Sequence, residues 1–204
     1  MRHAGYKRAG ERDGGARVRD LVARSTLVAG YAKTGDMGGA EAVVARMEKA
    51  GVAGDAWTFN ALLDGDAKAK NMVEAEAVLR RMSEKGVDAN VVAFSALLSG
   101  YVDGKRMRAA EGVLSRTQTA EVEANNWTYN HLMRGYRTNF VELVRIRDMM
   151  HAAGCAMDMY SCGYFMEALC RNWDSSPAHQ RDLWSTFEEA QGAGCITHRS
   201  RTGP

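Results

Sequence analysis

The stretch "WTFNALLDG" at residues 57–65 decides the fold, because the chain repeats it twice. It returns as "VAFSALLSG" at residues 92–100 and as "WTYNHLMRG" at residues 127–135, so the period is 35 residues. A phrase that recurs at a fixed period indicates a tandem array in which each repeat is one supersecondary unit. We therefore divide the chain into five repeats, which are residues 21–55, 56–90, 91–125, 126–158 and 159–198.

Each repeat has the pattern of two antiparallel helices. In the second repeat, apolar residues recur three and four positions apart in two successive runs, as on the buried face of a helix. The runs are Phe59, Leu62, Leu63 and Ala67, then Ala75, Val78, Leu79 and Met82. One helix pair cannot bury its apolar faces alone, so neighbouring pairs must stack. We predict an all-α fold, a helix-turn-helix repeat solenoid that forms a right-handed superhelix of about five helical hairpins.

Glycine recurs at two positions of the array. Gly51, Gly86 and Gly154 follow the second helix, where a left-handed cap is expected. A second set lies inside the first helix, where each glycine costs about 1 kcal/mol relative to alanine. Its members are Gly30, Gly65, Gly100 and Gly135, and we predict that they allow close contact with Ala40, Ala75 and Ala110 of the partner helix.

Composition and scattered reactive residues argue against several functions. The 46% hydrophobic and 25% charged content is ordinary for a globular protein. No apolar run reaches the roughly 18–20 residues of a membrane helix, so we expect no membrane partner. The four cysteines and five histidines show no metal-binding or catalytic spacing. We therefore predict no cofactor, no metal site and no catalytic residues, and hence a protein that is not an enzyme.

The ends of the chain differ from the repeats. Residues 1–20 are rich in glycine and arginine, and we predict that they form a basic disordered leader, with residues 199–204 as a short tail. The leader lacks the apolar core of a secretory signal. It is also a poor transit peptide, because it contains Glu11, Asp13 and Asp20. In the fifth repeat Gly163 replaces the polar residue of the earlier repeats, so we expect this repeat to cap the array.

A second face of the first helix carries polar residues that core packing does not explain. In the second repeat this face holds Trp57, Asn60 and Asp64, which are three and four positions apart. The equivalents are Val22, Ser25 and Ala29, then Val92, Ser95 and Ser99, then Trp127, Asn130 and Arg134. The first four repeats close on Asp55, Asn90, Asn125 and Asp158. A single Asp or Asn before a helix is an ordinary N-cap, but the joint recurrence of these positions favours a binding surface.

These residues resemble a known family. The segment "WTFNALLDGDAKAKNMVEAEAVLRRMSEKGVDAN" at 57–90 looks like a pentatricopeptide repeat, and "EAVVARMEKAGVAGD" and "MMHAAGCAMD" look like the endings of such repeats. The resemblance is to a P-type array and covers residues 21–158 well and 159–198 poorly. Proline is missing from the repeat ends, and Gly163 and His198 replace the polar pair of the last repeat.

The resemblance implies single-stranded RNA as the partner, with one base bound per repeat. The family's code implies that Ser25 with Asp55 favours G, Asn60 with Asn90 favours C or less strictly U, Ser95 with Asn125 favours A, and Asn130 with Asp158 favours U. Val22, Trp57, Val92 and Trp127 are the implied base-stacking residues. The expected RNA core is 5′-GCAU-3′ or 5′-GUAU-3′. Small polar side chains can bind the edge of an unpaired base while apolar ones stack on its face.

The family also implies a place and a role. Its members act in RNA processing, stability or translation in the mitochondrion or chloroplast, and protein partners would supply any catalysis. Two alternatives stay open at this point. A tetratricopeptide-like scaffold that binds protein has a near-identical helix pair with a period of about 34 residues. The chain could also be a fragment of a larger RNA-processing factor.

Overall fold

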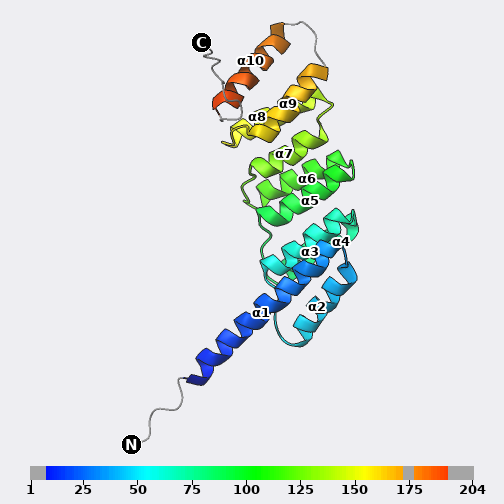
Figure 1. Cartoon of the computed structure of the whole chain (residues 1–204), viewed down its shortest axis with the longest axis vertical. Coiled ribbons are helices and arrows are strands. Elements are labelled where there is room, and N and C mark those ends of the chain that lie inside the picture. The colour runs from blue at the N-terminus through cyan, green and yellow to red at the C-terminus, as the bar shows by residue number, and fades with distance from the viewer. Residues whose placement is uncertain (1–7, 172–176, 193–204) are drawn as a thin grey trace, which may run out of the picture. The chain divides into compact units, whose positions relative to one another are not determined.

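The computed structural model describes residues 8–171 and 177–192, and within them every regular element is a helix and no strand occurs. Figure 1 shows the helices in chain order. They are α1 (Arg8–Thr34), α2 (Met37–Lys49), α3 (Ala56–Lys68), α4 (Met72–Glu84), α5 (Val91–Asp103), α6 (Met107–Thr119), α7 (Asn126–Gly135), α8 (Phe140–Ala152), α9 (Met159–Arg171) and α10 (Pro177–Gly192). The predicted all-α fold of helical hairpins is confirmed.

The helices pack as stacked hairpins within two compact halves, residues 1–100 and residues 101–204. In the N-terminal half, α1 packs against α2 and α3, and α3 packs against α4. In the C-terminal half, α7 packs against α8 and α9, and α9 packs against α10. First helices of successive repeats therefore lie next to one another within each half, so their side chains can act together. None of the described helices is both long enough and apolar enough to cross a membrane.

Helix starts follow the predicted repeats. The first helices of repeats two to five begin at Ala56, Val91, Asn126 and Met159, the first residue of each repeat. The fourth repeat is two residues short, and α7 is correspondingly reduced to 10 residues where α3 and α5 have 13. Relative to the other repeats, the fourth repeat is therefore shortened at the end of α7 and in the turn to α8, and the first turn of α7 is unchanged.

The N-terminal segment differs from its prediction. Residues 8–20 are part of α1, which is 27 residues long, whereas the composition predicted a disordered leader over residues 1–20. Alanine and arginine, which are among the strongest helix formers, recur through this segment, and no proline interrupts it. The helix corrects the prediction for residues 8–20. The predicted tail, 199–204, lies outside the described residues.

The glycines inside the first helices contact the preceding repeat rather than their own partner helix. A Cβ added to Gly65 would lie 2.5 Å from Met37 Sδ and 3.0 Å from Ala32 Cβ. Side chains cannot approach that closely, so α3 needs glycine here to pack against the first repeat. The prediction that Gly65 contacts Ala75 of its own partner helix is therefore wrong.

The same contact recurs along the chain. Gly100 faces Met72 and Ala67 in place of the predicted Ala110, and Gly135 faces Met107 and Val102. Gly30, in the first repeat, has no neighbouring heavy atom within 4 Å of an added Cβ, so its predicted contact with Ala40 is wrong as well. The methionines repeat with the 35-residue period just as the glycines do. We name this arrangement the glycine–methionine contact.

One buried position breaks the pattern of the repeats. The eleventh residue is tyrosine in the first, third and fourth repeats but Asp66 in the second. In the C-terminal half Tyr136 donates a hydrogen bond to Glu111 at 2.9 Å. Asp66 is only 4% exposed, and Glu41 occupies the position that corresponds to Glu111. Burial, followed by the charges of Glu41 and Glu74, raises the pKa of Asp66 to about 6, against an opposing effect of Arg81.

Candidate nucleic-acid interface

The second residue of each repeat is an exposed apolar or aromatic side chain. Val22, Trp57, Val92 and Trp127 are between 51% and 66% exposed. The apolar residues that follow two, five and six positions later in α3 are Phe59, Leu62 and Leu63, and all three are buried. The prediction that the four stacking residues lie off the core is confirmed. Tyr160, which the sequence did not single out, holds the same position in α9 and is 58% exposed.

The last residue of each repeat caps the next first helix through one side-chain oxygen. Asp55 Oδ1 accepts from Thr58 N at 2.9 Å, and Asn125 Oδ1 accepts from Thr128 N at 3.2 Å. Asn90 Oδ1 accepts from two backbone N–H groups, and so does Asp158 Oδ1, at distances of 2.9–3.1 Å. The N-cap role of these residues is therefore real, but it uses only one of the two terminal atoms.

The cap fixes what the second terminal atom can offer a ligand. Backbone N–H groups need an acceptor, so the capping atom of Asn90 and Asn125 must be the amide oxygen. The amide Nδ2 of each then remains as a hydrogen-bond donor. Asp55 and Asp158 present a second carboxylate oxygen instead, which can only accept. The closing Asn and Asp residues thus cap the next helix in the same way, but Asn offers a ligand a donor and Asp offers it an acceptor.

Two of the predicted pairs meet directly. Asn60 Nδ2 donates to Asn90 Oδ1 at 3.2 Å, and Asn130 Nδ2 donates to Asp158 Oδ2 at 2.8 Å. Asn60 is only 9% exposed. The Oδ1 atoms of Asn60 and Asn130 are buried and accept no hydrogen bond from the described residues. Each amide oxygen is therefore enclosed without a hydrogen bond that would offset its burial.

The predicted pair Ser25 and Asp55 is linked through a third residue. Ser25 Oγ lies 2.8 Å from Thr58 Oγ1, and Thr58 Oγ1 donates to Asp55 Oδ1 at 2.7 Å. Thr58 has one hydroxyl proton, and it uses this proton in the hydrogen bond to the Asp55 carboxylate. Ser25 must therefore donate its own hydroxyl proton to Thr58 Oγ1. Ser25 is 1% exposed. The hydroxyl of Ser25 therefore supports Asp55 from beneath, where the sequence predicted a side chain on the polar face.

Ser95 and Asn125, the pair predicted to bind A, fall in different halves of the chain. Ser95 is half-buried in α5, and Asn125 stands before α7. Within the C-terminal half Asn125 belongs to a full capping box, because the Thr128 hydroxyl accepts from Asn125 N at 3.4 Å. Its amide oxygen is thereby held at the helix end and its Nδ2 is left over.

Asp158 is held as an anion. Burial raises the pKa of its carboxyl, but hydrogen bonds from Ser161, Asn130 and Tyr160 together outweigh burial and lower the pKa below its ordinary value. Ser161 contributes both its backbone N–H at 3.0 Å and its hydroxyl at 3.1 Å. An anionic Asp158 is a strong acceptor for an N–H group on a ligand.

Asp158 and Asn130 open into a cavity of about 260 Å³ between α7 and α9. Its lining combines aromatic rings, amides and charged groups: Asn126, Trp127, Asn130, His131, Arg134, Asp158, Tyr160 and Tyr164. The Trp127 and His131 rings lie with their centroids 5.9 Å apart. Burial, helped by the charge of Arg134, lowers the pKa of His131, against an opposing effect of Asp103. His131 is therefore neutral at pH 7. The cavity thus combines aromatic rings, on which a planar ligand could stack, with polar side chains that could bind its edge.

Two family models match the sequence. The model of the pentatricopeptide repeat domain matches residues 18–65, and the model of the PPR repeat family matches residues 57–103. These ranges contain two of the four caps, Asp55 and Asn90, and the glycine–methionine contacts of Gly65 and Gly100. This is a pentatricopeptide repeat protein.

Solved pentatricopeptide repeat structures share the fold. The structure of PPR10 from maize has a TM-score of 0.70 and 23% identity, over 85% of this chain and 26% of that chain. The structure of PPR10 with an 18-nucleotide psaJ RNA element has a TM-score of 0.67 and 18% identity, over 90% of this chain and 29% of that chain. The chain therefore spans between a quarter and a third of the length of PPR10.

A third similar structure is that of the pentatricopeptide repeat domain of protein-only RNase P 1 from Arabidopsis thaliana in complex with tRNA. Its TM-score is 0.70 at 11% identity, over 88% of this chain and 93% of that domain. At these identities the likeness is one of fold. No protein with a curated description matches the sequence.

Sequence reasoning missed part of the site in this pentatricopeptide repeat protein. It took His131 as a scattered surface histidine, and it gave no role to Thr58, Tyr160 or Tyr164. A signal was present for His131, which stands four positions after Trp127 and therefore on the same helix face. Thr58 carried no such signal, because only the approach of α1 to α3 brings it between Ser25 and Asp55.

Proposed function

We propose that the chain binds single-stranded RNA and reads one base per repeat with the last residue of each repeat. The observation that carries the proposal is the capping geometry, which holds one side-chain oxygen at the helix end and leaves the other terminal atom to a ligand. In the fourth repeat Asp158 lines one cavity with Trp127, on which a base could stack, and stacking contributes about 1–3 kcal/mol per base. RNA complexes of the similar PPR10 and RNase P structures support this class of ligand.

Hydrogen-bond polarity sets the expected base. Guanine and uracil carry an N–H at the centre of their Watson–Crick edge, whereas adenine and cytosine carry a bare ring nitrogen there. The second carboxylate oxygen of Asp55 or Asp158 can accept from an N–H, which favours G or U; in Asp158 this oxygen also accepts from Asn130. The free Nδ2 of Asn90 or Asn125 donates to a ring nitrogen, which favours C or A. This polarity agrees with the G, C, A, U order implied by the family.

The residue that pairs with each closing residue differs in size between repeats. This size would distinguish the purine from the pyrimidine among the bases that share one hydrogen-bond polarity. Ser25 and Ser95 carry short side chains, and the pairs that the family implies assign purines to their repeats. Asn60 and Asn130 are longer and reach the closing residue itself, at 3.2 Å and 2.8 Å. A pyrimidine, which extends less far from the strand, fits the space that remains. The proposed core is therefore 5′-GCAU-3′, with U as the weaker alternative at its second base.

The cellular role follows from this activity. We infer that the chain acts in organellar RNA processing, stability or translation in a mitochondrion or chloroplast. The chain would act by binding to its target RNA, and protein partners would supply any catalysis. The near-neutral repeats support base reading, because a net charge of +2 over 204 residues provides little bulk attraction for phosphates.

A reciprocal exchange of the closing residues tests the proposal. Asp158→Asn replaces an acceptor with a donor while keeping the cap, because Asn and Asp cap helices about equally well. The variant should prefer GCAC over GCAU, and the change in discrimination should be about 1–3 kcal/mol. Asn90→Asp makes the opposite change in the second repeat and should prefer GUAU over GCAU. Fluorescence anisotropy with labelled RNAs of equal length that differ at one base measures both.

Melting temperatures provide the control, since both variants should unfold close to the wild type. A wild-type chain without any base preference would contradict the proposal and favour the protein scaffold. The capping-atom account would be wrong if the wild type is selective but both exchanges alter affinity equally for every RNA.

A further inference from the structure

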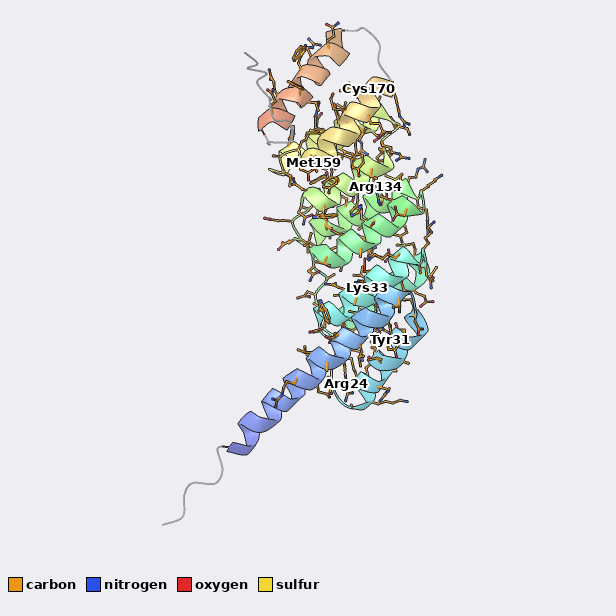
Figure 2. The ribbon with its side chains drawn as sticks, in the orientation of Figure 1. Arg24, Tyr31, Lys33, Arg134, Met159 and Cys170 are labelled. Atoms are coloured by element: carbon orange, nitrogen blue, oxygen red, sulfur yellow. The ribbon has the colours of Figure 1, made fainter. Side chains whose placement is uncertain are left out.

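We infer that Arg134 holds a phosphate of the bound strand, which makes the fourth repeat the electrostatic anchor of the interface; this rests on the proposed RNA binding. Arg134 lines the α7–α9 cavity together with Trp127 and Asp158. Figure 2 marks Arg134 on α7 and Met159 at the start of α9. A cavity with aromatic rings, a base-reading acceptor and a guanidinium has the groups that a whole nucleotide requires.

Helix geometry places these groups in a row. Trp127, Asn130, His131 and Arg134 stand at positions i, i+3, i+4 and i+7 of α7, so they share one face. The base-reading residues occupy the first turn of this face, and Arg134 lies about one turn beyond them. A base that stacks on Trp127 would therefore extend its sugar and phosphate along the helix towards Arg134.

The other repeats place different residues at this position. In repeat four the ninth residue of the repeat is Arg134. In repeats one, two, three and five the same position holds Ala29, Asp64, Ser99 and Glu167. Asp64 is itself paired with Lys68 at 2.5 Å. The arginine is thus not part of the repeated fold, which tolerates small and acidic residues at the same place. Its charge calls for a separate explanation.

The partner of Arg134 in the structure is one that a phosphate can displace. Arg134 donates to Asp103 at 2.7 Å, and the two side chains are 35% and 48% exposed. Ion pairs with this exposure contribute little to stability. Guanidinium groups bind phosphates in a bidentate geometry that a carboxylate at one nitrogen does not fill. Asp103 therefore competes with the strand for Arg134 and lowers its availability.

The remaining charges of the cavity give the nucleotide a direction. Asp158, which is hydrogen-bonded to Asn130 of this face, is an anion that repels a phosphate and can accept from the base. His131 lies between them, and its pKa is lowered by burial and by Arg134, so it adds no positive charge at pH 7. The base should therefore point towards Asp158 and the phosphate towards Arg134.

Two substitutions with opposite expected signs test the inference. Arg134→Gln removes the phosphate contact, so affinity for GCAU RNA should fall about fivefold at 0.1 M salt, and the slope of log K against log salt should shrink by about 0.7. Asp103→Asn frees Arg134 without changing it. This variant should bind about 1.4- to fivefold more tightly, the range that corresponds to an exposed ion pair. Discrimination between GCAU and GCAC should stay unchanged in both variants.

Arg145→Gln is the matched control, because Arg145 also pairs with an acidic residue of the preceding repeat, Glu111, but does not line the cavity. It should leave the salt slope unchanged. A purely structural ion pair would make Arg134→Gln and Asp103→Asn weaken binding alike, and that result would overturn the inference. An unchanged salt slope in Arg134→Gln, with GCAU still preferred, would overturn it while leaving the proposed function intact. A wild-type chain without any base preference would overturn both the proposed function and this inference.

Discussion

Replacing the buried carboxyl of Asp66 with an amide should stabilise the protein at neutral pH. Asp66 lies in α3, the helix that also carries Trp57 and Asn60, and its side chain faces the acidic residues Glu41 and Glu74. Its pKa is about 6 in the folded protein against 3.8 for an unperturbed aspartate. The folded state therefore binds a proton more tightly than the unfolded state does, and it loses stability when that proton leaves.

The size and the pH window follow from the two pKa values. One pKa unit corresponds to about 1.36 kcal/mol, so ionising Asp66 costs the folded state about 2–3 kcal/mol at pH 7. This stability is fully present below pH 3.8 and is lost as the pH rises through about 6. Asp66→Asn has no proton to lose, so it should match the wild type near pH 4 and exceed it at pH 7. The difference in melting temperature at pH 7 should be about 4–12 °C.

Thermal and urea unfolding between about pH 4 and pH 8 measures the effect. Asp64→Asn is the control, because Asp64 lies on the same helix but is exposed and paired with Lys68. That variant should change stability by less than about 1 kcal/mol, with no step near pH 6. Equal stability of Asp66→Asn and wild type at pH 7, or a difference that does not vary with pH, would refute the reasoning.

Two further predictions concern single positions. Thr58→Val removes the hydroxyl that joins Ser25 to Asp55, so the preference for GCAU over ACAU should fall by about 1 kcal/mol in RNA titrations, and Thr58→Ser should retain it. The opposite ranking of the two variants would contradict the relay. Glu121 has a φ of 54°, in the left-handed region that glycine adopts at the same position of other repeats. Glu121→Gly should therefore raise the free energy of unfolding by about 1 kcal/mol in urea, and a decrease would show that the turn is not strained.

The repeat pattern was sufficient to predict the helices and the exposed row of the interface. Proline-poor repeats with glycine at the helix ends and Asp or Asn before the next helix leave little freedom in where Ala56 or Asn126 begins a helix. Trp57 and Trp127 could be placed outside the core because they stand off the face that holds the leucines. These features depend on one helix and its own period, which a single sequence displays.

Contacts between repeats were harder to predict. The 35-residue period indicates that Gly65 packs closely on another residue, but Ala75 and Met37 belong to sets that recur with the same period, so the period does not distinguish them. The burial of Ser25 depends on how far α3 overlaps α1, which no spacing in the sequence records. The helical state of residues 8–20 was missed for a different reason, because composition alone does not separate a charged helix from a charged tail.

The glycine–methionine contact makes the array sensitive to oxidants. The Met72 thioether fits against Gly100 only because the glycine has no Cβ, and Met37 and Met107 are half-buried at equivalent contacts. Oxidation to the sulfoxide adds a polar, chiral oxygen to a side chain that already fills its space. Peroxide would thus loosen successive hairpins from one another without breaking either helix of a repeat. Methionine sulfoxide reductase would restore the packing, so the interface could be weakened and renewed by redox chemistry alone.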